Sequence, residues 1–279
     1  MKVKKLFFLC SIMLCGLMSC QQGNACHCGE NADGKVVADS VVTECVAAAD
    51  SVKTMEEPEP TPAPQVYKTP TLEEWDRLSW DGMPYREGRV TVNDTGRYAL
   101  AVFLHGKNGE GTDNVKHHTM EHGHYQILNH WEKRGMKGIV LMPQCPAGMT
   151  WTQQVMKDKL RGLIQHCAAT DSVDEGRIYI CGTSNGALGG WSMIQKWPEL
   201  FAGAMLAAAV PQGNSGGVPV CVVTGKNEGN CGNAMAALEA NTGTDVMYRY
   251  RPNWNHGQTC QQSFRETACL VWLFGHRRR

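Results

Sequence analysis

The chain has 279 residues, and its 27 Lys and Arg side chains balance 27 Asp and Glu side chains. Residues 71–279 alone carry 21 basic and 19 acidic side chains, a formal net charge of +2. Proteins that bind nucleic acid concentrate basic side chains on one face, so this balance predicts no nucleic-acid partner. The same 209 residues are enough for one domain with a sizeable core.

The first residues have the composition of an export signal. Three lysines among the first five residues precede an apolar run over residues 6–18, which is too short to span a membrane as a helix. The run ends in the letters LMSC, which resemble a bacterial lipobox. The resemblance implies a lipoprotein signal peptide over residues 1–19 and a lipid on the Cys20 thiol. We therefore expect an exported lipoprotein, anchored to a membrane on its periplasmic or cell-surface side. An ordinary signal peptide is the alternative.

Residues 20–70 have the composition of a flexible linker. Residues 21–70 contain eight acidic residues, three lysines and the proline-containing run EEPEPTPAP, with few large apolar residues. Such a segment buries too little apolar surface to fold, so we place the folded domain at residues 71–279. Cys26-His27-Cys28 offers possible zinc ligands, but no second pair completes them, and no metal is predicted there.

In the folded part, short apolar runs alternate with helix-like runs. The predicted strands are Arg89–Val92, Tyr98–Leu104, Gly138–Met142, Arg177–Cys181, Ala202–Ala208, Pro219–Thr224 and Asp245–Tyr250. The predicted helices lie near 116–134, 154–168, 185–197, 232–241 and 259–274. Several strands are almost continuously apolar, which is typical of strands buried on both faces. The alternation predicts an α/β fold with a mostly parallel central sheet flanked by helices.

A candidate nucleophile lies at one of these strand–helix junctions. Gly182-Thr183-Ser184-Asn185-Gly186 fits the G-x-S-x-G pattern between a strand and a helix. A sharp turn there would raise the Ser184 hydroxyl above the sheet, and small residues two positions away would avoid the strand and the helix. A glycine-rich turn without catalytic function would look similar, so the serine needs partners.

Two later strand ends supply those partners in the order serine, acid, histidine. Glu228 follows the predicted strand Pro219–Thr224, and His256 follows Asp245–Tyr250. We therefore predict that His256 is the general base for Ser184 and that Glu228 orients it. Asn227 could orient the imidazole instead. Asp245 is a weaker candidate because it starts its strand, at the wrong end of the sheet.

An acyl-transfer site also needs donors for the oxyanion that develops in the transition state. The backbone amide of Asn185, which follows the nucleophile, is one predicted donor. The loop after the strand Tyr98–Leu104 reads His105-Gly106-Lys107, and the backbone amide of Lys107 is the second. We expect His105 to have a structural role.

Four segments together resemble one family. "FLHGKNGEGTDN" (103–114), "LMPQCPAGMTW" (141–151), "DEGRIYICGTSNGALGGW" (174–191) and "VPVCVVTGKNE" (218–228) are similar to the predicted-peptidase and esterase branch of the α/β-hydrolases. That branch is related to phospholipase/carboxylesterases and to feruloyl and polyhydroxybutyrate-depolymerase-type esterases. The resemblance implies the α/β-hydrolase fold and a triad of Ser184, Glu228 and His256. It also implies that Trp151 borders the substrate pocket. The family usually has aspartate where this chain has Glu228, which leaves the acid open.

Other chemistry-bearing residues have weaker predictions. Trp254 precedes the histidine loop and is a second candidate for contact with substrate. Cys231 and Cys260 follow the acid and the base by a few residues, so they form a disulfide if the loops are neighbours; two unpaired thiols are the alternative. Five histidines cluster at 117, 118, 122, 124 and 130, but the H-E-x-x-H pattern is absent. We expect a polar helix face there and no zinc site.

The predicted protein is a serine hydrolase that cleaves carboxylic esters through an acyl-enzyme and needs no metal or organic cofactor. An ester on a small molecule or a polymer, such as an acylated carbohydrate, is the expected substrate. A peptidase on the same fold is one alternative. A catalytically silent binding protein at the membrane surface is another.

Overall fold

The computed structural model describes residues 74–91, 96–228, 234, 236–238, 241 and 243–278. The predicted signal peptide, the lipid-bearing Cys20, the linker over 20–70 and the predicted disulfide partner Cys231 all lie outside these residues. None of the described helices is long and apolar enough to cross a membrane.

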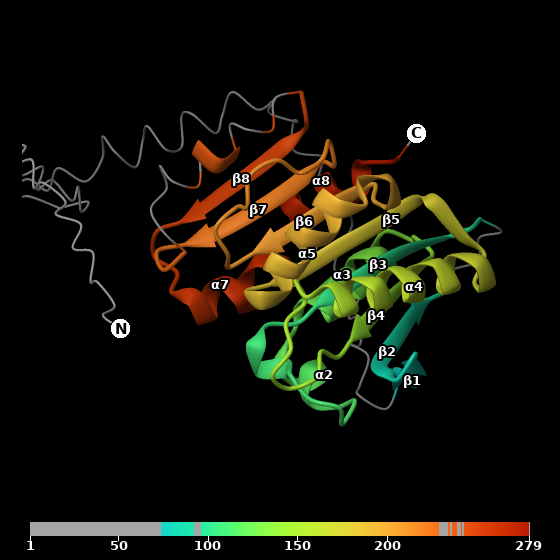
Figure 1. Ribbon diagram of the computed structural model, residues 1–279. Coiled ribbons are helices and arrows are strands. Elements are labelled where there is room, and N and C mark those ends of the chain that lie inside the picture. Colours follow the sequence, from blue (N-terminus) through green and yellow to red (C-terminus); the bar gives the residue numbers. More distant parts are fainter. Residues whose placement is uncertain are drawn as a thin grey trace, which may run out of the picture. The chain divides into compact units, whose positions relative to one another are not determined.

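One eight-stranded sheet organises the described residues, in the order β1-β2-β4-β3-β5-β6-β7-β8 (Figure 1). β1 and β2 are antiparallel to their neighbours, and the other six strands are parallel to one another. The strands are β1 (Asp76–Trp80), β2 (Met83–Val90), β3 (Tyr98–Leu104), β4 (Gly138–Pro143), β5 (Val173–Thr183), β6 (Gly203–Ala207), β7 (Val220–Gly225) and β8 (Val246–Arg251). The predicted mostly parallel α/β architecture is confirmed.

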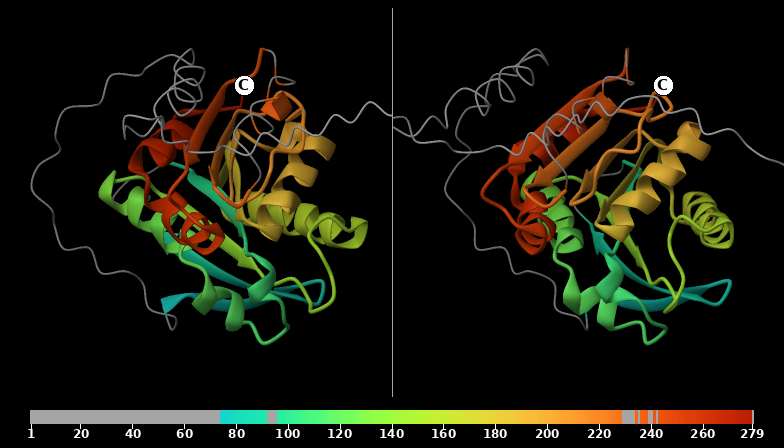
Figure 2. Two further views of the ribbon diagram at one scale, coloured as in Figure 1. Left: turned by 90° about the vertical axis from the view of Figure 1, so that its left-hand side faces the viewer. Right: turned by 60° about the vertical axis from the view of Figure 1, so that its left-hand side comes forward.

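Helices cover both faces of the sheet, as the two views of Figure 2 show. α4 and α5 pack on one face, and α3 and α8 pack on the other. The helices are α2 (Lys116–Met120), α3 (Gly123–Lys133), α4 (Gln154–Thr170), α5 (Asn185–Lys196), α7 (His256–Gln262) and α8 (Thr267–Gly275). Short 3₁₀ turns are η2 (Lys107–Gly109), η3 (Pro198–Leu200) and η4 (Ser263–Arg265).

The alternating side chains of β3 explain why both faces must be covered. Leu100, Val102 and Leu104 belong to the apolar cluster under α4 and α5, whereas Ala101 and Phe103 belong to the cluster under α3 and α8. All of these side chains are fully buried. Since successive residues of a strand face opposite sides, a strand that is apolar throughout requires a helical layer on each side.

Some predicted boundaries were wrong. Strand β1 was not predicted, and the prediction placed only the end of β2. The helix predicted over 116–134 is interrupted at Glu121 and His122, which separate α2 from α3. The helix predicted over 259–274 is three short elements instead, and the first of them begins at His256.

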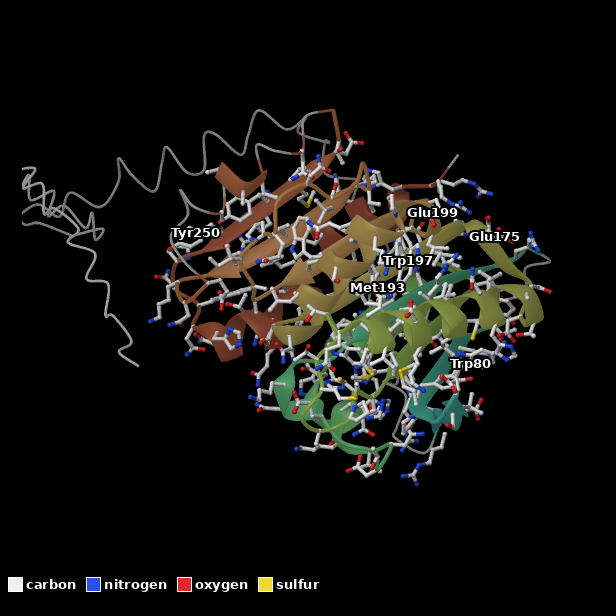
Figure 3. The ribbon with its side chains drawn as sticks, viewed as in Figure 1. Trp80, Glu175, Met193, Trp197, Glu199 and Tyr250 are labelled. Carbon is white, nitrogen blue, oxygen red and sulfur yellow. The ribbon has the colours of Figure 1, made fainter. Side chains whose placement is uncertain are left out.

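The parallel strands all end at one edge of the sheet, and the candidate site lies there. β3, β5, β7 and β8 are neighbours or near neighbours in the sheet order. Figure 3 shows Tyr250, near the end of β8, at this edge, and Glu175, near the start of β5, at the opposite one. Loops that leave neighbouring parallel strands at this edge can therefore bring distant parts of the sequence together.

Candidate active site

Ser184 occupies a strained turn between β5 and α5. Its backbone has φ 53° and ψ −118°, a conformation that residues with a side chain rarely adopt. Its amide donates to the carbonyl of Ala207 at 2.9 Å, which ties the turn to the end of β6. The turn therefore holds the serine in an unfavourable conformation at the edge of the sheet, as the motif predicts.

The glycines on either side of Ser184 are required by close packing. A Cβ on Gly182 would lie 2.6 Å from the carbonyl group of Gly186. A Cβ on Gly186 would lie 1.9 Å from the carbonyl oxygen of Leu104, at the end of β3. Any larger residue at either position would push the helix away from the strands, which is the physical reason for the spacing of the motif.

Ser184, His256 and Glu228 form a continuous hydrogen-bonded chain. The Ser184 hydroxyl lies 3.1 Å from His256 Nε2, and His256 Nδ1 lies 2.7 Å from Glu228 Oε1. With the proton on Nδ1, that nitrogen donates to the carboxylate and Nε2 accepts from the serine hydroxyl. The Glu228 side chain is 2% exposed and that of His256 is 51% exposed. The chain thus runs from a buried acid to a serine that solvent can approach.

The other oxygen of Glu228 is fixed as well. Oε2 accepts a hydrogen bond from the Gly225 amide at 2.5 Å and another from the Thr259 hydroxyl at 3.4 Å. Asn227 does not contact the imidazole: its side-chain oxygen accepts from the backbone amide of His256 at 3.1 Å. Of the candidate acids, Glu228 is therefore the one that reaches the ring, and Asn227 positions the segment that carries it.

Asp245 lies away from this group. It immediately precedes β8, and its carboxylate is 3.3 Å from Nε2 of His276, near the chain's C-terminal end. Its side chain is largely exposed. The structure thus places Asp245 at the start of β8, as the sequence predicted, and the candidate site lies at the other end of the strand.

His256 is the first residue of α7, and a capping box fixes the start of that helix. The Asn255 side chain accepts from the Gln258 amide, and the Gln258 side chain accepts from the Asn255 amide, both at 2.9 Å. This reciprocal pair satisfies two backbone donors at once. The position of His256 therefore depends on polar contacts at the helix terminus.

Two backbone amides beside Ser184 are free to bind an anion. The amides of Lys107 and Asn185 donate to no acceptor among the described residues. Asn185 begins α5, where the helix dipole favours negative charge. Lys107 begins η2 directly after Gly106, and a Cβ on Gly106 would lie 3.4 Å from the Cβ of Ser184. This close approach brings the loop after β3 to the serine, so the arrangement can hold an oxyanion next to a nucleophile.

Comparisons with known proteins bear on the fold. No family model matches the sequence, and a search of curated proteins finds no relative by sequence. Among solved structures, a thermostable esterase aligns with a TM-score of 0.61 at 24% identity, over 74% of this chain and 64% of that one. This chain thus spans less than two thirds of that esterase. The feruloyl esterase module of Clostridium thermocellum aligns with a TM-score of 0.58 at 14% identity, over 78% and 95% of the two chains.

A peptidase is similar too. Dipeptidyl peptidase 4 from Porphyromonas gingivalis aligns with a TM-score of 0.52 at 13% identity, over 72% of this chain and 35% of that one. The chain has the α/β-hydrolase fold. At these identities the alignments establish the fold and leave the reaction to be argued from the site.

Within this α/β-hydrolase fold, Glu121 is the residue that sequence reasoning missed. It lies between α2 and α3, and its side chain is buried. One carboxylate oxygen accepts from the Gly106 amide at 2.8 Å, and the other accepts from the Thr183 hydroxyl at 3.1 Å. Burial raises the pKa of Glu121 to about 7, although both hydrogen bonds favour the ionised form. A glutamate in the middle of a predicted helix gave no sign of this position.

The predicted role of Trp151 at the pocket border is not supported by its position. The side chain is 1% exposed, and its indole N–H donates to the carbonyl of His105 at 3.0 Å. Gly189 of α5 leaves the space that it fills, since a Cβ there would lie 2.3 Å from the Trp151 Cβ. Trp151 thus packs under the loop after β3.

Trp254 is only partly buried, 5.7 Å from the Arg251 guanidinium, and substrate contact there stays a prediction.

His105 has the structural role that was expected. It is fully buried, and its Nε2 accepts from the Cys145 amide at 3.0 Å. Its Nδ1 lies 2.6 Å from the carbonyl oxygen of Gly106. Burial lowers the pKa of His105 to about 4, so the ring is neutral at physiological pH. The ring therefore joins the loop after β3 to the end of β4.

The polar helix face predicted for the histidine cluster is wrong for four of its five members. His117, His118 and His124 are fully buried, and His130 is nearly so; only His122 is exposed. The ring of His118 lies 4.9 Å from that of Trp75 and 4.6 Å from that of His124. Desolvation lowers the pKa of His117 and of His118 to about 3. The rings of His118 and His124 thus form an aromatic cluster with that of Trp75.

No metal centre was predicted, and one group of possible ligands lies elsewhere in the described residues. Glu87, Cys167 and Asp171 are close enough to share an ion. Arg89, however, pairs with both carboxylates. A guanidinium between two carboxylates already offsets part of their charge, so this group is an ion-pair network between β2 and the end of α4.

The predicted disulfide stays a prediction. Cys260 is a free cysteine in the structure, and Cys231 lies outside the described residues. The Cys260 sulfur is 3.9 Å from His256 Nε2, one helical turn further along α7. Burial raises the pKa of its thiol to about 12, so the group is protonated and is a poor nucleophile.

Proposed function

We propose that this protein is a serine hydrolase that cleaves carboxylic esters through an acyl-enzyme. The observation that carries the proposal is the hydrogen-bonded chain from Ser184 through His256 to Glu228, with distances of 3.1 Å and 2.7 Å. A nucleophile, a base and an orienting acid in this geometry are the parts that acyl transfer requires. The α/β-hydrolase fold supports the same proposal, because in it the nucleophile, acid and base follow strands in this order, here β5, β7 and β8.

In the first half of the reaction, Ser184 Oγ attacks the ester carbonyl carbon while His256 Nε2 takes the hydroxyl proton. Glu228 stabilises the imidazolium and keeps Nδ1 protonated. The carbonyl oxygen becomes an oxyanion between the amides of Lys107 and Asn185. When the tetrahedral intermediate collapses, the C–O bond to the alcohol breaks and His256 returns the proton to the leaving alkoxide oxygen.

The second half releases the acid. A water molecule enters the place of the alcohol, and His256 removes one of its protons as the water oxygen attacks the acyl carbon. The same two amides hold the second oxyanion. The bond from the acyl carbon to Ser184 Oγ then breaks, His256 returns the proton to the serine oxygen, and the carboxylic acid departs. Apart from this water, each catalytic group in these steps belongs to the chain itself.

The exposure of His256 favours an ester that projects from a larger molecule. Its side chain is 51% exposed, so a substrate can reach the serine without passing through a closed tunnel. One similar structure is a feruloyl esterase module in complex with sinapinate. We propose an acylated carbohydrate as the substrate class, and the exposed side chain of His256 supports a substrate of that size.

Peptide-bond cleavage is the second candidate, favoured by the similarity to dipeptidyl peptidase 4. The aligned part is 35% of that peptidase, so the remainder of its chain has no counterpart in the alignment. Ester cleavage is preferred here, because no feature of the described site recognises a peptide terminus. A silent binding protein would have no need for a strained serine aligned with a base.

The deciding experiment is to label the purified domain with a fluorophosphonate, map the labelled peptide and then screen p-nitrophenyl esters against peptide p-nitroanilides. We expect the label on Ser184, its loss in His256→Ala, and cleavage of the esters in preference to the anilides. Preferential anilide cleavage would establish the peptidase. A folded protein that neither takes the label nor cleaves either substrate would leave the silent binding protein.

The N-terminal segment is a separate proposal. We propose that cleavage before Cys20 and lipid attachment to its thiol anchor the exported protein to a membrane on its periplasmic or cell-surface side. The composition of residues 1–20 supports it. Mass spectrometry of the protein purified from membranes should find a lipid on Cys20, and Cys20→Ser should release the protein from the membrane fraction. A full-length soluble protein with an unmodified Cys20 would refute the anchor.

A further inference from the structure

A buried carboxylate joins the two segments that carry the proposed oxyanion donors. Glu121 Oε1 accepts from the amide of Gly106, the residue before Lys107. Glu121 Oε2 accepts from the hydroxyl of Thr183, the residue before Ser184. The two segments come from different strands, β3 and β5, and the carboxylate comes from a third place, between α2 and α3. One side chain therefore contacts both sides of the proposed oxyanion site.

The bond to Gly106 also decides which amide of the loop is free. Because the Gly106 amide donates to Glu121, it is not available to an oxyanion, whereas the next amide, that of Lys107, donates to no acceptor among the described residues. Gly106 fits between these two groups because it has no side chain: a Cβ there would lie 3.2 Å from Glu121 Oε1 and 3.4 Å from the Ser184 Cβ. The glycine thus lies between the carboxylate and the nucleophile, and both contacts restrict how the loop can move.

Burying a carboxylate here is unfavourable for stability. Desolvation is the largest influence on its pKa and opposes ionisation, while the Gly106 amide, the Thr183 hydroxyl and the charge of His256 favour it. An apolar residue would fill the same space without that cost. A buried acid that bonds to both segments next to a reactive serine is therefore a candidate for a functional role.

We propose that Glu121 is a positioning residue that clasps the loop after β3 to the nucleophile turn, so that the amides of Lys107 and Asn185 converge on one oxyanion. The inference rests on the proposed hydrolase function. Glu121 touches no reacting atom and acts through Gly106 and Thr183. Donors held in place before the reaction stabilise the transition state more than donors that must first be ordered.

The two hydrogen bonds of Glu121 should depend on pH, whereas apolar packing in the same place would not. The ionised carboxylate can accept both hydrogen bonds, whereas protonation turns one oxygen into a donor and weakens the arrangement. The titratable groups that face or adjoin Glu121 are His256 and Cys260 of α7 and, in its own segment, His122. Protonation of Glu121 should therefore lower the rate as the pH falls. Glutamine at position 121 keeps an acceptor for Gly106 and cannot be protonated.

The test compares Glu121→Ala, Glu121→Gln and Thr183→Val with the wild type, using p-nitrophenyl acetate and thermal melting. We expect Glu121→Ala to lower kcat by about 100-fold, the scale of a lost oxyanion donor, with little change in KM. Glu121→Gln should retain kcat to within a few-fold, and its log kcat should fall less steeply than that of the wild type as the pH falls. Thr183→Val, which keeps the Gly106 bond, should lose less than Glu121→Ala.

Glu132→Ala is the matched control, because it removes an exposed carboxylate from α3 and should leave kcat and KM unchanged.

A folded Glu121→Ala with wild-type kcat would overturn the inference. So would a folded Glu121→Gln with the same loss as Glu121→Ala, or with the wild-type pH profile. If Glu121→Ala does not fold, Glu121→Gln and Thr183→Val decide alone. Failure of the proposed function is distinguishable, since the wild type itself would then cleave no ester and take no fluorophosphonate label, and both proposals would fall together.

Discussion

The two halves of the candidate site are held in place by different forces. In the nucleophile half, Ser184 is strained and the glycines beside it leave no space, so backbone packing fixes its position. In the acid–base half, the side chain of His256 is 51% exposed and depends on a helix cap and on the Asn227 side chain. We infer that changes in the nucleophile half endanger both folding and rate, whereas changes in the acid–base half affect mainly the rate.

The largest expected effect removes the nucleophile without disturbing the packing around it. Ser184→Ala should lower kcat by about 10⁶-fold, because the members of such a triad act as a unit. Alanine keeps a Cβ in the same strained turn, so the melting temperature should change little. Ester turnover and thermal unfolding followed by circular dichroism measure the two quantities. Activity within tenfold of the wild type would show that another residue attacks the ester.

A second large effect tests the acid. Glu228→Gln should lower kcat by about 10⁴-fold with little loss of stability. The oxygen that faces the Gly225 amide and the Thr259 hydroxyl must remain an acceptor. The glutamine nitrogen would then face His256 Nδ1 and donate to it, which selects the wrong tautomer of the imidazole. Steady-state kinetics measure the loss.

Asp245→Asn is the control for that variant, because it makes the same chemical change at a carboxylate that contacts His276 instead. Its activity should equal that of the wild type. Comparable losses in the two variants would mean that the orienting acid has not been identified.

Two glycine variants contrast the halves directly. Gly186→Ala would bring a Cβ to 1.9 Å from the Leu104 carbonyl oxygen, whereas in Gly257→Ala the new Cβ would lie 3.5 Å from the Asn255 side-chain oxygen, an ordinary contact distance. We expect the first to lower the free energy of unfolding by about 3 kcal/mol and the second to leave it nearly unchanged. Urea unfolding measures both. Equal destabilisation would remove the distinction between the packed nucleophile turn and the exposed start of α7.

The sequence predicted best those elements that are buried on both sides. Strand β3 was predicted from Tyr98 to Leu104, where the structure has it, because a short run that is apolar throughout is typical of a strand buried on both faces. Strand β1 was missed, since it lies at the edge of the sheet and its residues are mostly exposed. Its pattern carries neither the apolar run of a central strand nor a clear alternation.

The site shows the same limit. Ser184, Glu228 and His256 could be selected because each follows a strand in a known order. Glu121 could not, because its burial depends on contacts with Gly106 and Thr183, which are 15 and 62 residues away along the chain. The resemblance to the esterase branch implied that Trp151 borders the pocket. Packing decides whether a tryptophan side chain is buried, and Trp151 is buried here because Gly189 leaves space for it.

The smallest expected effect concerns the dependence of stability on pH. Burial holds the pKa of His105 near 4 and that of His124 well below its ordinary value of about 6.5. In the unfolded chain these rings bind protons at about pH 6.5. Their contribution to stability is therefore fully present above that pH and is lost as the pH falls toward the native pKa values. Each such ring lowers the free energy of unfolding by up to about 1.4 kcal/mol per pH unit in that window.

This acid sensitivity should arise in the segment that holds the buried rings, from the loop after β3 to α3. Glu121 opposes it, because its raised pKa lets the native state bind a proton between about pH 7 and 4.5 while the unfolded state does not. We expect urea unfolding midpoints to fall from pH 7 to pH 5, and to fall less in His124→Phe. The ring of His124 lies among those of Trp75 and Phe103, and both of its nitrogens lack a partner among the described residues. An unchanged pH slope in that variant would place the acid sensitivity in another group.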